Sequence, residues 1–323
     1  MSKIILSKSE SLQAPVLILA YKRYDFLDNL LGSLPANRNI YIHIDGPRNM
    51  DKSDVAITND VAMKYKIAQR SDYIHIFSQK TNLGNLGSFR ASMEWVFAKE
   101  DRVIFLEEDI RFGESLFPFM DWALEKFENS NHIFQINGLS FLDQIPGKNR
   151  LYESYSCRPW GFGTWKSRWE LYKQSNLPSD PSEIFKLPLF KNASMTESFK
   201  HKWLERFHRL NEGTDTYDLS WNYAAWENRA CALAPRFTYT TNVGFDDRSL
   251  HTKIRPRGLR FPHQIKVRRI KFEDISIVPF PSFYDAYSDF IEWGTPGIKK
   301  GATSRIFIAV YMILRRLKRI LNK

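Results

Sequence analysis

Three consecutive carboxylates, Glu107, Glu108 and Asp109, directly follow the apolar run 103–106. A short apolar run of this kind is typical of a buried strand in a parallel sheet that is covered on both faces. Three neighbouring acids repel one another unless a cation lies among them. Ligands of open α/β sheets bind beyond the carboxyl ends of the strands, which is where these acids are expected.

Hard divalent cations such as Mg²⁺ and Mn²⁺ coordinate carboxylate oxygens and share their remaining positions with phosphates. The three acids therefore favour a site for a metal ion and a phosphate-bearing ligand. A solvated acidic turn after a strand explains the same residues, so the rest of the chain must distinguish the two interpretations.

The elements around these acids alternate in type. We predict strands at 15–20, 39–44, 73–77 and 103–106, and helices at 25–34, 54–69 and 88–99. This alternation predicts parallel β-α-β units and a doubly wound sheet. Beyond Asp109 the order changes to a helix at 116–127, a strand at 133–136, an aromatic and glycine-bearing stretch at 158–165, a Pro-rich loop at 176–190 and a helix at 196–210.

The composition is that of a soluble globular protein. A chain of 323 residues can form one large α/β domain, alone or with a smaller appendage. The hydrophobic content of 43% and the charged content of 26% are ordinary. Aromatic residues make up 15%, which suits either sugar-stacking surfaces or a large core.

The net charge of +11 is concentrated at one end of the chain. Residues 250–323 contain 16 Lys and Arg against 5 Asp and Glu, whereas residues 1–249 contain 31 of each. An anionic surface, either membrane lipid or nucleic acid, is therefore the expected partner of the tail.

Cysteine usage and apolar runs bear on localisation. Only Cys157 and Cys231 are present, so a disulfide scaffold is not expected and a reducing cytosol fits best. Residues 1–14 contain no apolar core of signal-peptide length, and no stretch approaches the roughly 20 apolar residues of a membrane-spanning helix.

Three blocks of sequence together resemble the GT-A fold sugar-nucleotide-dependent glycosyltransferases, most closely the N-acetylglucosaminyltransferase I family and its bacterial relatives in surface-polysaccharide synthesis. The first block is 16–23 with Asp45-Gly46, and the second is 82–84 leading to the three acids, which is similar to the family's Glu-Asp-Asp. The third is 220–223, continuing to 242–245 and 250–252. Together they span roughly residues 14–252.

The resemblance implies that Asp109 binds Mn²⁺ or Mg²⁺ at the diphosphate of a nucleotide-sugar donor. It places Glu108 near the donor ribose or sugar, Asp45 at the nucleobase, and Arg23 at the base or phosphates. Glu108 replaces the family's middle aspartate, which leaves its role open. The donor-binding residues implied in this way are Ala20, Tyr21, Arg23, Asp45, Asn82, Gly84, Glu107, Glu108, Trp160 and Gly161. His251 is a second metal or diphosphate ligand, or a structural residue.

One departure from the family concerns the catalytic base. The family's Trp-Asp pair reads Trp221-Asn222 here, and an amide cannot accept a proton in a general-base step. Asp218 is the base we expect instead, and Asp215 and Glu227 are alternatives. Asn222, Asp218 and Glu108 are therefore the candidates for catalysis, and loss of activity is the other interpretation of Asn222.

Two further motifs have two interpretations each. Residues 160–163, Trp-Gly-Phe-Gly, suit a sugar or acceptor platform, because glycines permit close backbone approach and aromatics stack on sugar rings. They also suit a hydrophobic loop over the sheet.

Residues 82–87 can bind phosphate at a helix start, or form a plain turn and cap; they lack the lysine of a P-loop.

The tail divides at residue 304. Residues 253–271 carry eight basic side chains and no recognised nucleic-acid signature, so a nucleic-acid partner is not expected. In 304–323, apolar residues at helical spacing precede Arg315, Arg316, Lys318 and Arg319. A basic amphipathic helix of this kind lies on an anionic membrane surface, although docking on the protein's own core gives the same pattern.

These observations predict a GT-A α/β domain at 1–252, with a donor half at 14–110 and an acceptor half at 111–252. A basic extension at 253–303 and a membrane-surface helix at 304–323 follow. The expected function is metal-dependent, inverting transfer of a sugar from a nucleotide-diphosphate sugar to a lipid-linked glycan. The expected location is the cytoplasmic face of a bacterial membrane. The alternatives on the same fold are a retaining transferase and a nucleotidyltransferase, and the absence of a Gly-rich, lysine-bearing start loop argues against the second. From a different class, the alternative is a nucleotide-sugar-binding scaffold that has lost activity.

Overall fold

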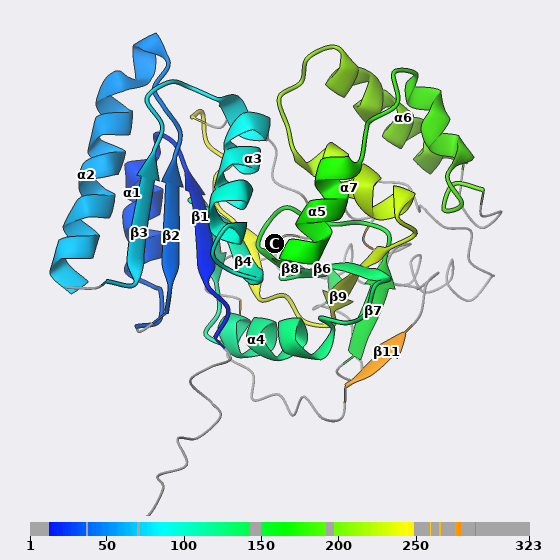
Figure 1. Cartoon of the computed structure of the whole chain (residues 1–323), viewed down its shortest axis with the longest axis horizontal. Helices are drawn as coiled ribbons and strands as arrows, with labels where there is room; N and C mark the ends of the chain where they lie inside the picture. Colours follow the sequence, from blue (N-terminus) through cyan, green and yellow to red (C-terminus); the bar gives the residue numbers. More distant parts are fainter. Residues whose placement is uncertain are drawn as a thin grey trace, which may run out of the picture.

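The computed structural model describes residues 13–36, 38–69, 72–142, 150–191 and 197–248, together with 259, 265, 275–278 and 288. In the part described, one large sheet runs through the molecule, with helices on both faces (Figure 1). The order of its nine strands is β11-β7-β9-β6-β8-β4-β1-β2-β3. The chain is thus a doubly wound α/β protein with a Rossmann-like nucleotide-binding architecture, as the alternation of elements predicts.

The first half of the sheet is parallel. It consists of β1 (Val16–Ala20), β2 (Ile40–Ile44), β3 (Ile74–Ser78) and β4 (Arg102–Glu107). β1 pairs with β2 on one side and with β4 on the other, so the strand order reverses at β1. Crossover helices α1 (Tyr24–Leu31), α2 (Lys52–Gln69) and α3 (Gly84–Phe97) connect these strands.

The second half of the sheet is mixed. β8 (Phe162–Trp165) lies antiparallel between β4 and β6 (Ile133–Asn137). β9 (Cys231–Pro235) is parallel to β6, and β7 (Arg150–Ser154) is antiparallel to β9. The glycine-bearing stretch 158–165 therefore supplies a central strand as well as a loop. β11 (Ser276–Val278), from the basic extension, pairs with β7, so the sheet continues past residue 252.

Alternate residues of β1 reach two separate cores, as strand geometry requires. Leu17 and Leu19 pack with α3, α5 (Lys166–Gln174), α6 (Glu197–Asn211) and α7 (Asp218–Glu227). Val16, Ile18 and Ala20 pack with α1, α2 and α4 (Leu116–Lys126). Aromatic side chains fill the first core, where Phe89 stacks on Tyr217 with 4.1 Å between ring centroids. The high aromatic content is therefore largely core.

Several elements were not predicted or begin at other residues than expected, and the cause is clear for α3 and α7. α3 begins at Gly84, four residues before the expected start at residue 88, because carboxylates from elsewhere in the chain cap its first amides. α7 was not predicted, because eight of its ten residues are buried and no polar face gives the usual helical period. The short 3-10 helix η3 (Pro181–Lys186) lies within the predicted Pro-rich loop.

A two-stranded ribbon beyond β4 is the last of the elements that position the site. β5 (Ile110–Phe112) follows the three acids directly and pairs antiparallel with β10 (Thr240–Asn242). Among the described residues, no helix is long and apolar enough to cross a membrane. The predicted helix at 304–323 lies outside them, as does most of the extension at 253–303.

Candidate functional site

A cavity of about 530 Å³ opens at the carboxyl ends of β1, β2 and β4, where the strand order reverses. This is the position at which doubly wound sheets bind their ligands. Most of the residues predicted from sequence line it, namely Ala20, Tyr21, Arg23, Asp45, Asn82, Gly84, Glu107, Glu108, Asp109, Trp160, Asp218 and Asn222. Gly161 does not line it, and His251 lies outside the described residues.

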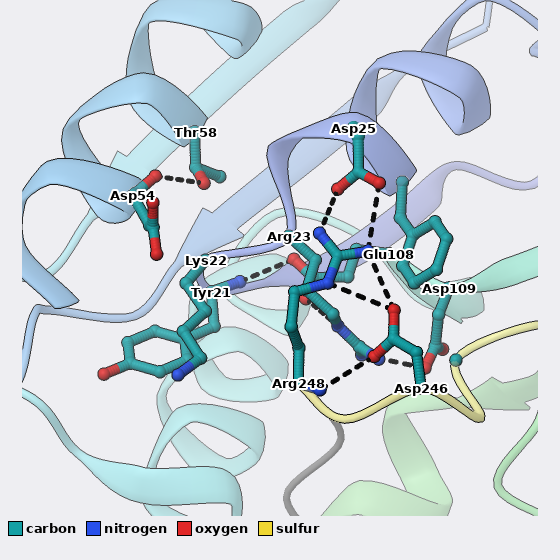
Figure 2. Close-up of polar contacts among 12 residues, drawn as sticks. Tyr21, Lys22, Arg23, Asp25, Asp54, Thr58, Glu108, Asp109, Asp246 and Arg248 are labelled. Carbon is teal, nitrogen blue, oxygen red and sulfur yellow. Dashed lines mark hydrogen bonds and ion pairs between the residues drawn. The ribbon is translucent and has the colours of Figure 1, made fainter.

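The cation beside Glu108 and Asp109 is an arginine of the chain itself (Figure 2). Arg23, just beyond β1, donates from Nε to Glu108 Oε1 and from Nη2 to Asp109 Oδ2, each at 2.8 Å. Burial opposes the positive charge, but Asp109 and Glu108 outweigh it and raise the pKa of Arg23. The backbone N–H of Tyr21 also donates to Glu108 Oε2, at 2.8 Å. The loop after β1 thus binds both oxygens of the Glu108 carboxylate.

Glu107 forms its hydrogen bond with Tyr217 rather than with Arg23. Its Oε1 accepts a hydrogen bond of 3.0 Å from the hydroxyl of Tyr217. Burial, followed by repulsion from Asp109, raises the pKa of Glu107 to about 8, and Asp218 adds to the effect. Tyr217 and Arg23 lower it, but not enough to compensate. Burial and the nearby Asp109 carboxylate therefore both favour the protonated form of Glu107.

The β5–β10 ribbon brings a distant segment onto Asp109. Asn242 donates from Nδ2 to Asp109 Oδ1 at 3.1 Å, and Val243 N donates to the Asp109 carbonyl at 2.9 Å. Gly244 follows, and a Cβ at this position would overlap the Asp109 carboxylate and approach Arg23 Nη1 at 2.5 Å. The segment continues to Arg248, which forms ion pairs with Asp25 and Asp246 (Figure 2).

Asp45 organises the start of α3. Its carboxylate accepts hydrogen bonds from the backbone N–H groups of Gly46, Leu83 and Gly84 and from Asn82 Nδ2, at 2.8–3.1 Å. A carboxylate has about four acceptor positions, so these donors occupy most of its capacity. Asn82 Oδ1 in turn accepts from Arg48 Nε at 3.1 Å. Asp45 and Asn82 thus line the cavity and hold together the turn that precedes α3.

The next amides of α3 are capped by Asp215, in the loop between α6 and α7. Its carboxylate accepts from Asn85 N at 2.6 Å and Leu86 N at 2.8 Å. Gly84 has φ +73°, and a Cβ there would overlap this carboxylate. The start of α3 is therefore a capped turn, and the interpretation of residues 82–87 as a phosphate cradle does not hold, because Asp45 and Asp215 occupy its amides.

Asp218 begins α7, Asn222 lies one turn later, and the two side chains have different environments. Asp218 Oδ2 accepts from Arg206 Nη2 at 2.6 Å, and Thr216 Oγ1 donates to Oδ1. Asn222 Oδ1 accepts from Cys157 N at 2.8 Å, and its Nδ2 donates to the Cys157 carbonyl at 3.0 Å. The side-chain amide of Asn222 therefore joins α7 to the backbone of Cys157 through both its donor and its acceptor, which accounts for an amide at this position.

Trp160 and Gly161, the first two residues of the predicted platform at 160–163, have separate roles. Trp160 lines the cavity and packs edge-on against Phe245, with 5.9 Å between ring centroids. Gly161 has φ +83°, and a Cβ there would lie 2.7 Å from Thr240 Cγ2. Its carbonyl accepts from Gly138 N at 2.8 Å. Trp160 alone offers a surface to a ligand, and Gly161 permits close packing beneath it.

The carboxylates at this site supply only part of the coordination that a divalent cation requires. Mg²⁺ commonly binds through one or two carboxylates together with phosphate oxygens of a substrate. Glu107 and Asp109 provide two such carboxylates, and repulsion from Asp109 adds to the effect of burial in raising the pKa of Glu107. In the described part of the chain no group of three or more His, Cys, Asp or Glu side chains has the geometry of a complete metal site. The phosphates of a ligand would have to complete the coordination.

The arginines that line one side of the cavity were not predicted from the sequence. Trp203, Arg206 and Arg209 recur every third residue along α6 and all line it, together with Arg158 from the segment beneath α7. The three-residue spacing of an aromatic and two arginines was a usable signal, since such residues share one side of a helix. Other lining residues that were not among the predicted site residues include Arg48, Tyr217, Asn242, Gly244 and Arg248.

Comparisons with known proteins add little beyond the fold class. No protein-family model and no curated protein matches the chain. Among solved structures, the chain is similar to 4-diphosphocytidyl-2C-methyl-D-erythritol synthase from Anaerococcus prevotii, with 13% identity over 56% of this chain and 85% of that one and a TM-score of 0.32. A mannose-1-phosphate geranyltransferase from Thermus thermophilus has 14% identity, coverages of 69% and 73%, and a TM-score of 0.22. A putative glucose-1-phosphate thymidylyltransferase from Bacillus anthracis has 14% identity, coverages of 67% and 95%, and a TM-score of 0.26.

Proposed function

We propose that the chain is a metal-dependent, inverting glycosyltransferase that transfers a sugar from a nucleotide-diphosphate sugar to a lipid-linked glycan in the synthesis of a bacterial surface polysaccharide. The observation that carries the proposal is the convergence of Glu107, Asp109 and Asp218 on one cavity at the switch point of the sheet. A donor's nucleoside would lie toward Tyr21 and Arg48, and its sugar toward Trp160.

In the proposed reaction an acceptor hydroxyl oxygen forms a bond to the anomeric carbon while the bond to the diphosphate breaks. Asp218 is the group assigned to take the hydroxyl proton, and Arg206 and Thr216 orient its carboxylate. Arg23 holds Glu108 and Asp109 in place for the donor. A divalent ion, held by Glu107 and Asp109, would supply charge neutralisation of the departing diphosphate.

The proposal has a direct binding test. Isothermal calorimetry with UDP-, GDP- and dTDP-sugars, with and without Mn²⁺, should give metal-dependent binding of one donor that Asp109→Asn abolishes. Asp60→Asn is the matched control, because Asp60 is an exposed acid on α2 that does not line the cavity. If no donor binds to the wild-type protein, the glycosyltransferase assignment is wrong.

Turnover separates an enzyme from a binding protein. Asp218→Asn should abolish sugar transfer while leaving the affinity for the donor within about twofold, because the carboxylate acts on the acceptor hydroxyl. Unchanged turnover would show that Asp218 is not the catalytic base, and Glu107 would then be the next candidate for that role. Donor binding without any turnover in the wild type would favour the scaffold alternative, which Asn222 first suggested, and product stereochemistry would distinguish inversion from retention.

A further inference from the structure

The basic extension beyond residue 252 meets the rest of the domain at several of the residues that the structure describes. β11 pairs with β7 at the outer edge of the sheet (Figure 1). Ile265 lies against Gly113, where an added Cβ would be 2.6 Å from Ile265 Cγ2. Ser288 is fully buried, and its hydroxyl accepts a hydrogen bond of 3.3 Å from Arg158 Nη2. The described residues of the extension are therefore built into the domain.

Leu259, also in the extension, is buried in a small apolar cluster. Only 6% of its surface is exposed. The other buried members of the cluster are Leu139, Phe141 and Leu142, which follow β6, and Ala234 on β9. The extension thus contributes a side chain to a core that the sheet and the segment after β6 leave incomplete.

Two residues of the site rest on this cluster. Trp160 and Phe245 both pack against it, and they also pack edge-on against each other, with 5.9 Å between ring centroids. Trp160 lines the cavity and is the aromatic surface assigned above to the sugar. Phe245 directly follows Gly244, in the segment that contacts Asp109. The cluster therefore lies behind a ring that faces the ligand.

The position of the Trp160 ring depends on packing. Its backbone carbonyl is fixed by a hydrogen bond of 2.7 Å from Thr240 Oγ1. The ring itself packs against Phe245, the Leu259 cluster and the core beneath α1, α2 and α4. Protein interiors are close-packed, and neighbouring side chains shift toward a void when a large side chain is truncated. A change at Leu259 should therefore reach Trp160.

From these contacts we propose that Leu259 is a positioning residue, which holds the Trp160 ring at the orientation that accepts the sugar of a nucleotide-sugar donor. The basic extension would then help to set donor specificity. Leu259 does not line the cavity and acts only through Trp160. The inference rests on the proposed function, because it takes Trp160 as the surface for the sugar.

The position of Trp160 can be measured without any ligand. In the full chain labelled with 5-fluorotryptophan, the ¹⁹F resonance of Trp160 is the one that Trp160→Phe removes. We expect Leu259→Ala to shift or broaden this resonance, and Leu259→Met, which nearly conserves the volume, to leave it in place. Ile277→Ala is the control, because Ile277 is a 40% exposed residue of the same extension outside the cluster. An unmoved Trp160 resonance in Leu259→Ala would overturn the inference.

The effect on specificity is measured by calorimetry with three pairs of ligands: UDP-glucose and UDP, GDP-mannose and GDP, and dTDP-glucose and dTDP. For a pair that binds the wild type, Leu259→Ala should weaken the nucleotide sugar about tenfold and leave the nucleoside diphosphate within about twofold. Trp160→Ala should have the same effect, and the double variant should show no additional loss.

Two results in these titrations would overturn the inference. An equal loss for both members of a pair would show a general structural effect, and an unchanged ratio of the two affinities would show that Leu259 does not act on the sugar. If no pair binds the wild type, the proposed function is wrong and the role in specificity falls with it. The ¹⁹F spectrum still decides whether Leu259 positions Trp160, so the two failures are distinguished.

Discussion

Arg23 donates a hydrogen bond of 2.8 Å to Asp109, although 86 residues separate them in the chain. The same guanidinium binds Glu108, so one cation from the loop after β1 balances two of the three acids after β4. The pairing of β1 with β4 brings the two loops together, and their side chains are largely buried. The site is therefore built on an internal ion pair before any ligand binds.

Replacing Arg23 by Gln should destabilise the fold and abolish donor binding. The substitution leaves Glu108 and Asp109 buried without their cation, and losing one partner of a buried ion pair typically costs about 3–5 kcal/mol. Urea unfolding would measure this loss. The double variant Arg23→Gln/Glu108→Gln should recover part of the stability, whereas two independent, additive losses would contradict the coupling.

Gly244→Ala should damage the site through packing alone. The added methyl would overlap the Asp109 carboxylate and crowd Arg23, so we expect a loss of about 1–3 kcal/mol in unfolding free energy, typical of overpacking, and weaker donor binding. Gly32→Ala is the control, because its Cβ would come no closer than 3.5 Å to Asp28 O and its φ is −63°. Similar behaviour of the two variants would show that the 242–248 segment does not constrain Asp109.

Asp215→Ala should release the α6–α7 loop from α3. The variant removes the acceptor for Asn85 N and Leu86 N, so hydrogen exchange at these two amides should accelerate at least tenfold. The cost in stability should be about 1 kcal/mol, as for other helix-capping carboxylates. Asp180→Ala removes a comparable cap from η3 and should leave the α3 amides protected. Unchanged exchange in Asp215→Ala would mean that other groups cap α3.

His43 should make stability depend on pH. Its side chain is fully buried on β2 beside Phe77, and burial lowers its pKa to about 4, below the unfolded value near 6.5. The neutral form is therefore favoured in the fold. The stabilisation is complete above about pH 6.5 and declines as the pH falls toward 4, by up to about 3 kcal/mol.

Urea unfolding at pH 7 and pH 5 checks this prediction. His43→Gln should show a smaller difference between the two values than the wild type. His132→Gln, which changes an exposed histidine, should keep the full difference. An unaltered pH dependence in His43→Gln would show that other groups dominate acid unfolding.

Much of the fold follows from the sequence because the signals are local. The apolar runs of β1, β2, β3 and β4 and the intervening helices have clear periods, and their alternation requires a doubly wound sheet. The position of the three acids at the end of β4 follows from the same pattern, as does their placement at the ligand edge. α7 and β8 were missed because both are buried and rich in aromatics, so neither shows an amphipathic period.

The sequence determined which residue types were available at the cavity, and the tertiary structure decided what each one does. Asp45 and Asp215 read as ligand-binding or catalytic acids, yet both cap α3, because the fold brings unsatisfied helix amides to them. The partner of Asp109 is Arg23, and Arg158 joins Arg206 and Arg209, only because distant segments meet across the sheet. Electrostatic balance depends on distances through space, and those are set by strand pairing and packing rather than by position along the chain.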